Sequence, residues 1–267
     1  MTLIVARIHG DEITAVSDTK ITFTASCWEH PERKSRRVYD DPVLKLAIVH
    51  PYLAIGAAGD YPGDALEEAS YAWNGPIDEL LQSLKSYSGK RNTGFVVCAL
   101  DPARLWRVSD GIVYERTNHR EAHEGDREPH EIFMDLYNDW SDEIDAPFRM
   151  VSSMHGITDG PWKRNDLSAG GHAVHLTTVH GEFRYLQFDT TVLEHTPGND
   201  PLFRQRFATG HGSTPGAFAI FIPQRHHQIL FAHQRPWEAM QVEAETIDDL
   251  ISAANESHGQ YLKIAGT

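Results

Sequence analysis

The chain has 267 residues, of which 40% are hydrophobic and 23% charged, a composition typical of ordinary globular proteins. Acidic side chains outnumber basic ones by 38 to 24, so the formal net charge of −14 argues against nucleic acid as a partner. No apolar run approaches the roughly 20 residues that a membrane span needs, and the two cysteines suggest neither a disulfide framework nor a cysteine-based zinc site. We therefore expect a cytoplasmic protein that binds neither nucleic acid nor membranes.

The chain begins with two apolar, β-branched runs that predict an antiparallel hairpin. The runs cover residues 2–8 and 13–17, and turn-forming residues at 9–12 separate them. Pairing about residues 10 and 11 places residues 18 and 19 opposite residues 2 and 3. The hairpin therefore predicts that Thr2 and the carboxylate of Asp18 are neighbours.

Thr2 carries chemistry of its own if Met1 is removed, as cytosolic processing usually does before a small residue. The α-amine of Thr2 would then be free, and such an amine titrates at about 8. Near neutral pH it can accept the proton of the threonine hydroxyl. Nucleophile and base would then belong to one residue.

The next apolar run, residues 43–49, contains a lysine. Lys45 is poorly suited to the middle of an apolar strand unless its ammonium group has a partner. The run leads into residues 53–60, where Gly56, Ala57, Ala58 and Gly59 are small enough for the backbone to be approached closely.

Two helices and three strands follow these first four strands. Helical spacing and boundary residues predict helices over residues 63–72 and 76–84. Apolar runs predict a hairpin of residues 93–100 and 103–108, with a third strand at 111–115. This order is expected of a sandwich of two sheets that carries its helices on the outer faces.

The series Thr2, Asp18, Lys45 and Gly59 resembles the proteasome β-subunit and HslV branch of the N-terminal-nucleophile hydrolases. The Thr2–Asp18 and Lys45–Gly59 spacings match that family residue for residue. The intervening segment is longer than in the family, with the extra residues near 27–41. Lys34 lies at the uncorrected spacing but in a basic, loop-like stretch, so we assign the family's lysine to Lys45.

The resemblance continues to residue 188 and departs from the family at two positions. Asp166 and the double glycine that follows it match, and residues 172–178 and 182–188 match the closing hairpin. Ala169 stands where the family has a serine, with Ser168 one residue early. Asp126, before a predicted helix through residues 132–137, stands near a second family serine. The resemblance implies an α+β fold with αββα layers over residues 1–188.

The resemblance also implies catalytic roles. Thr2 Oγ would attack an amide carbonyl, Lys45 would favour the alkoxide, and Asp18 would hold Lys45 in place. The Gly59 N–H would bind the oxyanion, and Asp166 would orient the nucleophile. No cofactor or metal is implied. The residues that would bind an extended substrate include the strand at 20–22 and an apolar pocket: Lys20, Ile21, Thr22, Val43, Ala47, Ala57, Tyr61 and Ala65.

Residues 189–267 lie beyond the resemblance and form a C-terminal extension, expected to pack on the same domain. We expect a loop over residues 190–215 with a turn at 197–200, a hairpin of residues 217–222 and 228–232, and a helix that starts at 246 and ends near Gly259. Because the family forms rings, the resemblance implies a homo-oligomer that acts on a peptide or protein. It leaves open whether an unfoldase delivers the substrate.

Two other functions compete with a peptidase. One is a proteasome-like scaffold without turnover, which the two missing serines favour, and the other is an amidase with a non-peptide substrate. Among the 16 histidines, the best candidate metal cluster is His119, His123 and His130, but Gly125 and Pro129 interrupt the helix that would align them. His172 and His175 should face opposite sides of a strand. His211 is a candidate loop base, but Ser213 beside it lacks the context of a nucleophile elbow. We interpret the histidines as dispersed and solvated.

Overall fold

The computed structural model describes residues 2–20, 42–158, 167–186, 189–193, 202–210, 214, 216–223 and 225–264. These residues form a mixed α/β fold with three antiparallel sheets and five α-helices. No helix among them is long and apolar enough to cross a membrane.

The first sheet combines strands from the start of the chain, β1 and β2, with the later strands β8, β9 and β10, in the order β10-β9-β2-β1-β8. Its strands are β1 (Leu3–His9), β2 (Glu12–Asp18), β8 (Glu121–Gly125), β9 (Ala173–Val179) and β10 (Glu182–Tyr185). The second sheet has the order β3-β4-β5-β6-β7. Its strands are β3 (Leu46–His50), β4 (Leu53–Gly59), β5 (Thr93–Ala99), β6 (Arg104–Ser109) and β7 (Ile112–Glu115).

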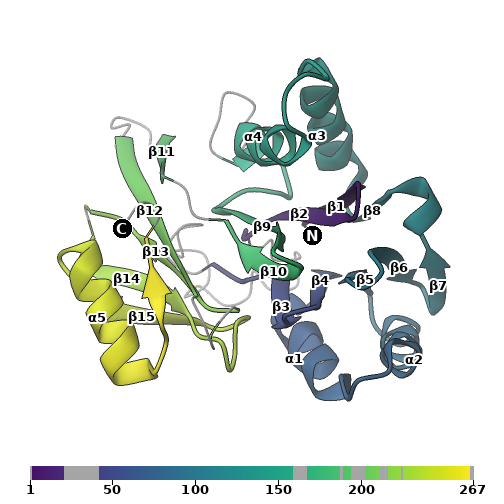
Figure 1. Cartoon of the computed structure of the whole chain (residues 1–267), viewed down its shortest axis with the longest axis horizontal. Coiled ribbons are helices and arrows are strands. Elements are labelled where there is room, and N and C mark those ends of the chain that lie inside the picture. Colours follow the sequence, from purple (N-terminus) through teal and green to yellow (C-terminus); the bar gives the residue numbers. More distant parts are fainter. Residues whose placement is uncertain are drawn as a thin grey trace, which may run out of the picture.

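The two sheets lie face to face between two pairs of helices (Figure 1). Helices α3 (Arg127–Asp139) and α4 (Ala146–Thr158) cover the first sheet, and α1 (Pro62–Ala72) and α2 (Ile77–Ser88) cover the second. Strand β1 is buried on both sides, which explains its continuous apolar run. Ile4 and Ala6 belong to the core between the sheets, whereas Leu3 and Val5 pack with residues of α3 and α4.

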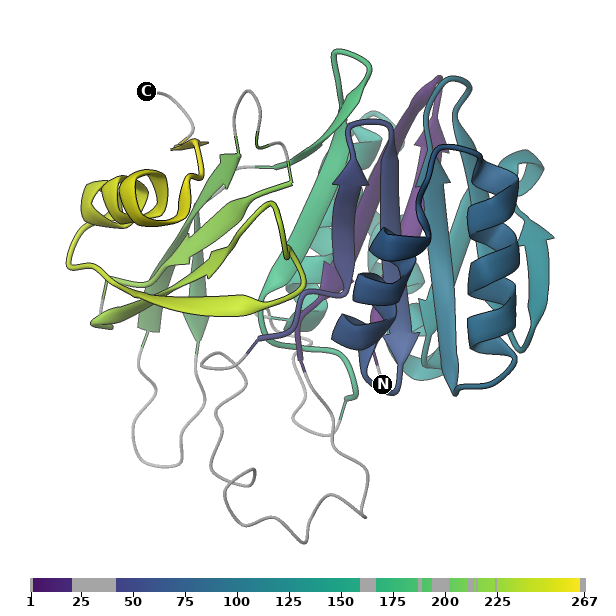
Figure 2. The same cartoon turned by 90° about the horizontal axis from the view of Figure 1, so that it is seen from below.

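The third sheet forms the C-terminal part, which stands beside the layers in Figures 1 and 2. It has the order β11-β12-β13-β14-β15, with β16 paired to β12. Its elements are β11 (Asp189–Leu193), β12 (Leu202–Gly210), β13 (Phe218–Phe221), β14 (His227–Phe231), β15 (Ala239–Glu243), α5 (Ile247–His258) and β16 (Leu262–Lys263).

The C-terminal part shares its apolar core with the first part. Phe218 belongs to the same core cluster as the residues between the first two sheets, and its ring lies 4.7 Å from that of Tyr185 in β10. The Tyr185 hydroxyl donates to Leu46 O (3.0 Å) and accepts from Ile48 N (3.2 Å), so it ties the first sheet to the second. On its other face, β13 packs against α5 through Ala219.

Most predicted elements appear, with boundary shifts of a few residues. Thr246 and Asp249 form the capping box that starts α5, and Gly259 ends it in a left-handed conformation. The strand expected at 43–49 begins only at Leu46, so Lys45 directly precedes it. The expected loop over 190–215 is wrong, because β11 and β12 lie within it; the expected turn at 197–200 is outside the described residues.

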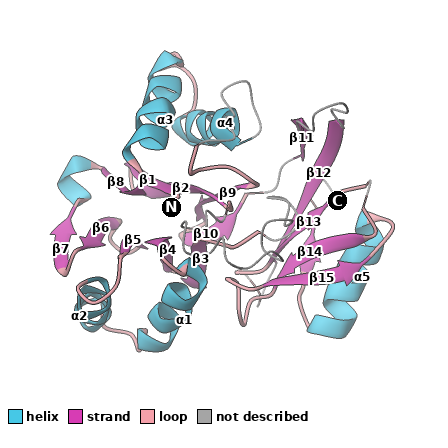
Figure 3. Cartoon of the chain, turned by 180° about the vertical axis from the view of Figure 1, so that it is seen from behind, coloured by secondary structure: helices cyan, strands magenta, loops and turns pink. Residues whose placement is uncertain are grey.

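Several further elements, among them β8, α4 and β15, were not predicted. Strand β8 lies in a segment that looked polar, because its inward-facing position 124 carries a glutamate, which pairs with Arg107 rather than with apolar neighbours. Helix α4 and strand β15 also had no prediction. Figure 3 shows α4 beside α3, on the same face of the first sheet.

Candidate functional site

The N-terminal hairpin brings Thr2 to Asp18, as its sequence predicted. The pairs Ile4–Ser17 and Val5–Val16 set the register, so the start of β1 lies beside the end of β2. Thr2 Oγ1 donates a hydrogen bond to Asp18 Oδ1, and the same oxygen accepts from Leu3 N at 3.0 Å. Thr2 is 1% exposed and Asp18 is fully buried.

The other carboxylate oxygen of Asp18 is held by backbone groups from two segments. Oδ2 accepts from Lys20 N at 3.1 Å and from Gly170 N at 3.0 Å. Gly170 O in turn accepts from the backbone N–H groups of Thr19 (3.2 Å) and Lys20 (2.9 Å). A carboxylate bound by several N–H donors is fixed in position.

Lys45 reaches this carboxylate from the second sheet. Its backbone is held by a hydrogen bond from Ala57 N to Lys45 O (2.8 Å), while Val43 N donates to Thr19 O (3.2 Å). Lys45 Nζ lies 3.1 Å from Asp18 Oδ1 and 3.0 Å from Oδ2, and it donates to Lys20 O at 2.5 Å. The ammonium therefore has an acceptor for each of its three protons.

Lys45 is 2% exposed, so its charge is removed from water. Burial lowers the pKa of Lys45, and the adjacent Asp18 carboxylate works against that change. Thr2 and Lys45 thus share one oxygen of a buried carboxylate, which places a hydroxyl and a cation side by side. A hydroxyl oxygen beside a fixed positive charge is easier to deprotonate than one in water.

Gly59 ends β4 near the same point. Asp60 N donates to Asn92 O, directly before β5, whereas Ala57 N donates to Lys45 O on the opposite side. Because N–H groups alternate between the two edges of a strand, the Gly59 N–H is directed away from β5, to the side of Lys45. Gly59 has a φ of +117°, and a Cβ there would lie 2.1 Å from Asn92 O, so only glycine fits.

The corner between β8 and α3 contacts the backbone carbonyl of Thr2. Asp126 N donates to Thr2 O at 3.0 Å, and a Cβ on Gly125 would lie 1.9 Å from the same oxygen. A cavity of about 140 Å³ adjoins Thr2 and Gly59, and its wall includes the acidic residues Asp110, Glu124 and Asp126. Glu124 is paired with Arg107, whose Nε lies 2.8 Å from Oε2.

The remaining predicted residues lie around this site with different exposures. Lys20 Nζ donates to Leu167 O at 2.5 Å, Ala57 is fully buried, and Val43 is half-buried. Tyr61 is 63% exposed at the start of α1. Three predicted residues lie outside the described part of the chain: Ile21, Thr22 and Asp166. The alternative lysine Lys34 lies outside it as well.

Two parts of the site had no signal that identified them in the sequence. Gly170 was recognised as part of a glycine pair, but its N–H bond to Asp18 depends on contact between segments 152 residues apart. Arg107 was assigned only to a strand. Its position between Leu105 and Val108 gives it a place on the pleat, but not the identity of its partner Glu124.

The histidines are less solvated than expected. His172 is fully buried, and His175 is 1% exposed with its ring 5.0 Å from that of His155; burial lowers the pKa of His175 well below its ordinary value. His123 and His130 do come together and stack at 3.6 Å. Burial, and then the nearby His130, lower the pKa of His123 to about 4. The third predicted member of that cluster, His119, is exposed, and His211 lies outside the described residues.

No family model and no curated protein sequence matches this chain. Among solved structures, it is similar to eukaryotic HslV from Trypanosoma brucei. The two are 16% identical in sequence, and the superposition has a TM-score of 0.48 and covers 67% of this chain and 100% of that one.

Proposed function

We propose that this chain is a threonine-type N-terminal-nucleophile hydrolase that cleaves peptide or amide bonds after Met1 has been removed. The observation that carries the proposal is the buried contact of Thr2 and Lys45 with one carboxylate, Asp18. Burying a lysine and an aspartate together is costly and adds little stability compared with apolar packing. Such a pair beside a hydroxyl at the start of the chain is therefore better explained by chemistry than by stability.

In the proposed mechanism, the Thr2 α-amine takes the proton of Oγ, directly or through a water molecule, as Oγ attacks the carbonyl carbon. The Lys45 ammonium stabilises the negative charge on Oγ, and Asp18 fixes Lys45. The Gly59 N–H, directed to the Lys45 side of β4, donates to the oxyanion. Breakdown of the tetrahedral intermediate releases the amine and leaves an ester on Thr2, which water hydrolyses. By resemblance, Asp166 assists in orienting the nucleophile.

The layers of helices and sheets support the assignment of an αββα hydrolase fold to residues 1–188, with residues 189–267 as an extension. We propose that an extended substrate pairs with the segment at 20–22 on one side and with the Gly59 segment on the other. The protein would act in the cytoplasm as a homo-oligomer. The proposal includes an unfoldase as a possible partner that delivers the substrates.

A second candidate is a scaffold of the same fold without turnover. It is favoured by Asp126 and Ala169, which stand where the resemblance places serines, and by the near-complete burial of Thr2. An amidase for non-peptide substrates is a third candidate, since the same nucleophile serves other acyl groups.

The experiment combines intact mass with hydrolysis of fluorogenic peptides. Intact mass should show loss of one methionine residue. Thr2→Ala should abolish hydrolysis, and Thr2→Ser should keep part of it because a hydroxyl survives. Thr14→Ala is the matched control: this threonine is fully buried in the same hairpin, where it bonds Thr177, and its loss should leave hydrolysis in place. Hydrolysis by Thr2→Ala at the parent's rate would exclude Thr2 as the nucleophile.

If Met1 is removed but neither peptides nor simple acyl amides are hydrolysed, the scaffold is the better description. Hydrolysis of acyl amides but not of peptides would favour the non-peptide amidase.

A further inference from the structure

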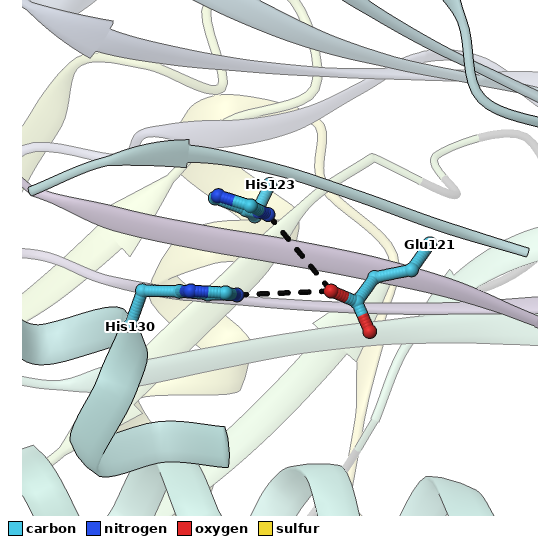
Figure 4. Close-up of side chains that lie close together, drawn as sticks. All are labelled: Glu121, His123 and His130. Carbon is cyan, nitrogen blue, oxygen red and sulfur yellow. Dashed lines mark ion pairs between the residues drawn. The ribbon is translucent and has the colours of Figure 1, made fainter. Parts of the chain in front are cut away.

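A cluster of three side chains lies at the corner where β8 passes into α3 (Figure 4). Glu121 and His123 come from β8, and His130 comes from the first turns of α3. Glu121 Oε1 lies 3.9 Å from His123 Nδ1 and 3.7 Å from His130 Nε2. One ligand atom from each of the three residues lies within 4.8 Å of the other two. Both imidazole rings therefore direct a nitrogen to the same carboxylate oxygen.

These contacts are within ion-pair range but longer than hydrogen bonds, and an ion pair requires a protonated histidine. The Nε2 atom of His130 is buried and has no hydrogen-bond partner among the described residues. The second carboxylate oxygen of Glu121 is engaged separately, 3.5 Å from Arg7 Nη1. Arg7 thus holds Glu121 from one side and leaves Oε1 facing the two rings.

We propose that Glu121, His123 and His130 bind a zinc ion. Two imidazole nitrogens and one carboxylate oxygen are a ligand set that zinc commonly takes in proteins, with water in the fourth position. Magnesium and calcium are not favoured, because they prefer oxygen ligands throughout. The side chains of Glu121, His123 and His130 are 19%, 33% and 17% exposed, so a cation can reach them from solvent.

Zinc binding requires a modest rearrangement of the rings. The rings stack with an interplanar angle of 16° and centroids 3.6 Å apart. Zinc lies about 2.0–2.1 Å from each imidazole nitrogen, which corresponds to about 3.3 Å between two ligand atoms in a tetrahedral site. The ligand atoms must therefore approach one another, and the two stacked rings must splay so that each points its nitrogen at the ion.

The position of the cluster suggests what the ion would do. His123 and His130 lie on either side of the Gly125–Asp126 corner, which contacts the backbone of Thr2. An ion bound by both histidines would clamp β8 to the start of α3 and fix this corner. The zinc site does not depend on the proposed hydrolase function, and it would exist equally in a scaffold without turnover.

The test uses the full-length, metal-free protein titrated with zinc and with cobalt(II). We expect one ion per chain, a rise in thermal midpoint on zinc addition, and the intense visible absorption of four-coordinate cobalt. Glu121→Gln, His123→Gln and His130→Gln should each weaken affinity by more than the roughly 10- to 100-fold that loss of an outer hydrogen-bond partner of a metal ligand costs. Affinity is measured by competition with a chromophoric chelator.

His119→Gln is the matched control, because His119 is an exposed histidine two residues before Glu121. It should bind zinc as the parent does. The proposal is overturned if the parent shows no stoichiometric binding at micromolar zinc, if the three variants bind as tightly as the parent, or if His119→Gln loses as much affinity as they do. If a variant fails to fold, the cobalt spectrum of the parent decides alone, since six-coordinate, weakly absorbing cobalt would contradict this ligand set.

Discussion

Replacing Asp18 by asparagine tests the central contact of the site with little change in volume. The variant keeps one side-chain oxygen but loses the negative charge opposite the Lys45 ammonium. It also places an NH₂ group where Asp18 accepts hydrogen bonds, so some of the donors on Thr2, Leu3, Lys20 and Gly170 lose their acceptor.

The expected cost follows from the burial of Lys45, which is 2% exposed. Removing one partner of a buried ion pair costs about 3–5 kcal/mol, because the other charge is left uncompensated. For a chain of this size, each kcal/mol lowers the melting temperature by about 2–4 °C. Asp18→Asn should therefore melt roughly 6–20 °C below the parent at pH 7.

The pH dependence has a definite sign. Burial lowers the pKa of Lys45, and Asp18 opposes that change, so the variant should have the lower Lys45 pKa. Between the folded-state pKa and about 10.4, the unfolded chain binds more protons at this lysine than the native protein does. Stability then rises with pH, and the deficit of Asp18→Asn should shrink from pH 7 to pH 10.

The assay is calorimetry or circular dichroism at both pH values, with two controls. Asp18→Asn/Lys45→Met removes the buried charge as well and should recover part of the lost stability. Asp11→Asn makes the same substitution at the exposed turn of the same hairpin and should melt like the parent. If Asp18→Asn melts like the parent, or if adding Lys45→Met recovers nothing, the buried ion pair does not have the energetic role assigned to it.

Four further predictions follow from the same structure. Gly125→Ala should lose hydrolysis and melt at a lower temperature, because its Cβ would collide with Thr2 O. Gly10→Ala is the control: Gly10 has a φ of +62° but nothing within 4 Å of an added Cβ. Its free energy of unfolding, measured by urea denaturation, should fall by only the roughly 1–2 kcal/mol of backbone strain. Burial lowers the pKa of His175, so at pH values below about 6.5 the unfolded chain binds a proton at this residue before the native protein does, and the free energy of unfolding should decrease. Thermal melts at pH 5 and pH 7 should show a smaller difference for His175→Gln than for the parent. Peptides with aspartate before the scissile bond should be cleaved more slowly than those with leucine or lysine, because neither an apolar pocket nor an acidic cavity wall accepts a carboxylate. Faster cleavage of the aspartate peptide would contradict both the apolar pocket and the role of the acidic wall. Static light scattering of the full-length chain should show an oligomer, and a clean monomer would oppose a compartmental peptidase.

The local sequence determined the hairpin and therefore the meeting of Thr2 with Asp18. The two strands are joined by a two-residue turn, and the register of such a hairpin follows from its turn. The same reasoning predicted α5, whose capping residues at 246 and 249 act within one helical turn. These features depend on neighbours in the chain, and periodicity and turn chemistry are sufficient to find them.

The contacts of Lys45 could be predicted only in part from the sequence. A lysine among apolar residues indicated a buried partner, and the resemblance indicated Asp18, but the segment at 21–41 prevents any argument from spacing alone. The contact is made because Lys45 stands at the start of the second sheet, opposite the end of β2. Packing of one sheet on another decides such contacts, and no local pattern records it.

The tertiary structure alone decided the surroundings of the site. Strand β8 looked like a polar loop because its buried glutamate is paired with Arg107 on another sheet, and charge compensation at a distance has no signature in one strand. In the cluster of Glu121, His123 and His130, the sequence suggested the two histidines, but only the fold placed Glu121 beside them and His119 away from them. Sequence therefore predicted the candidate residues Thr2, Asp18 and Lys45, whereas the fold determined which other partners surround them.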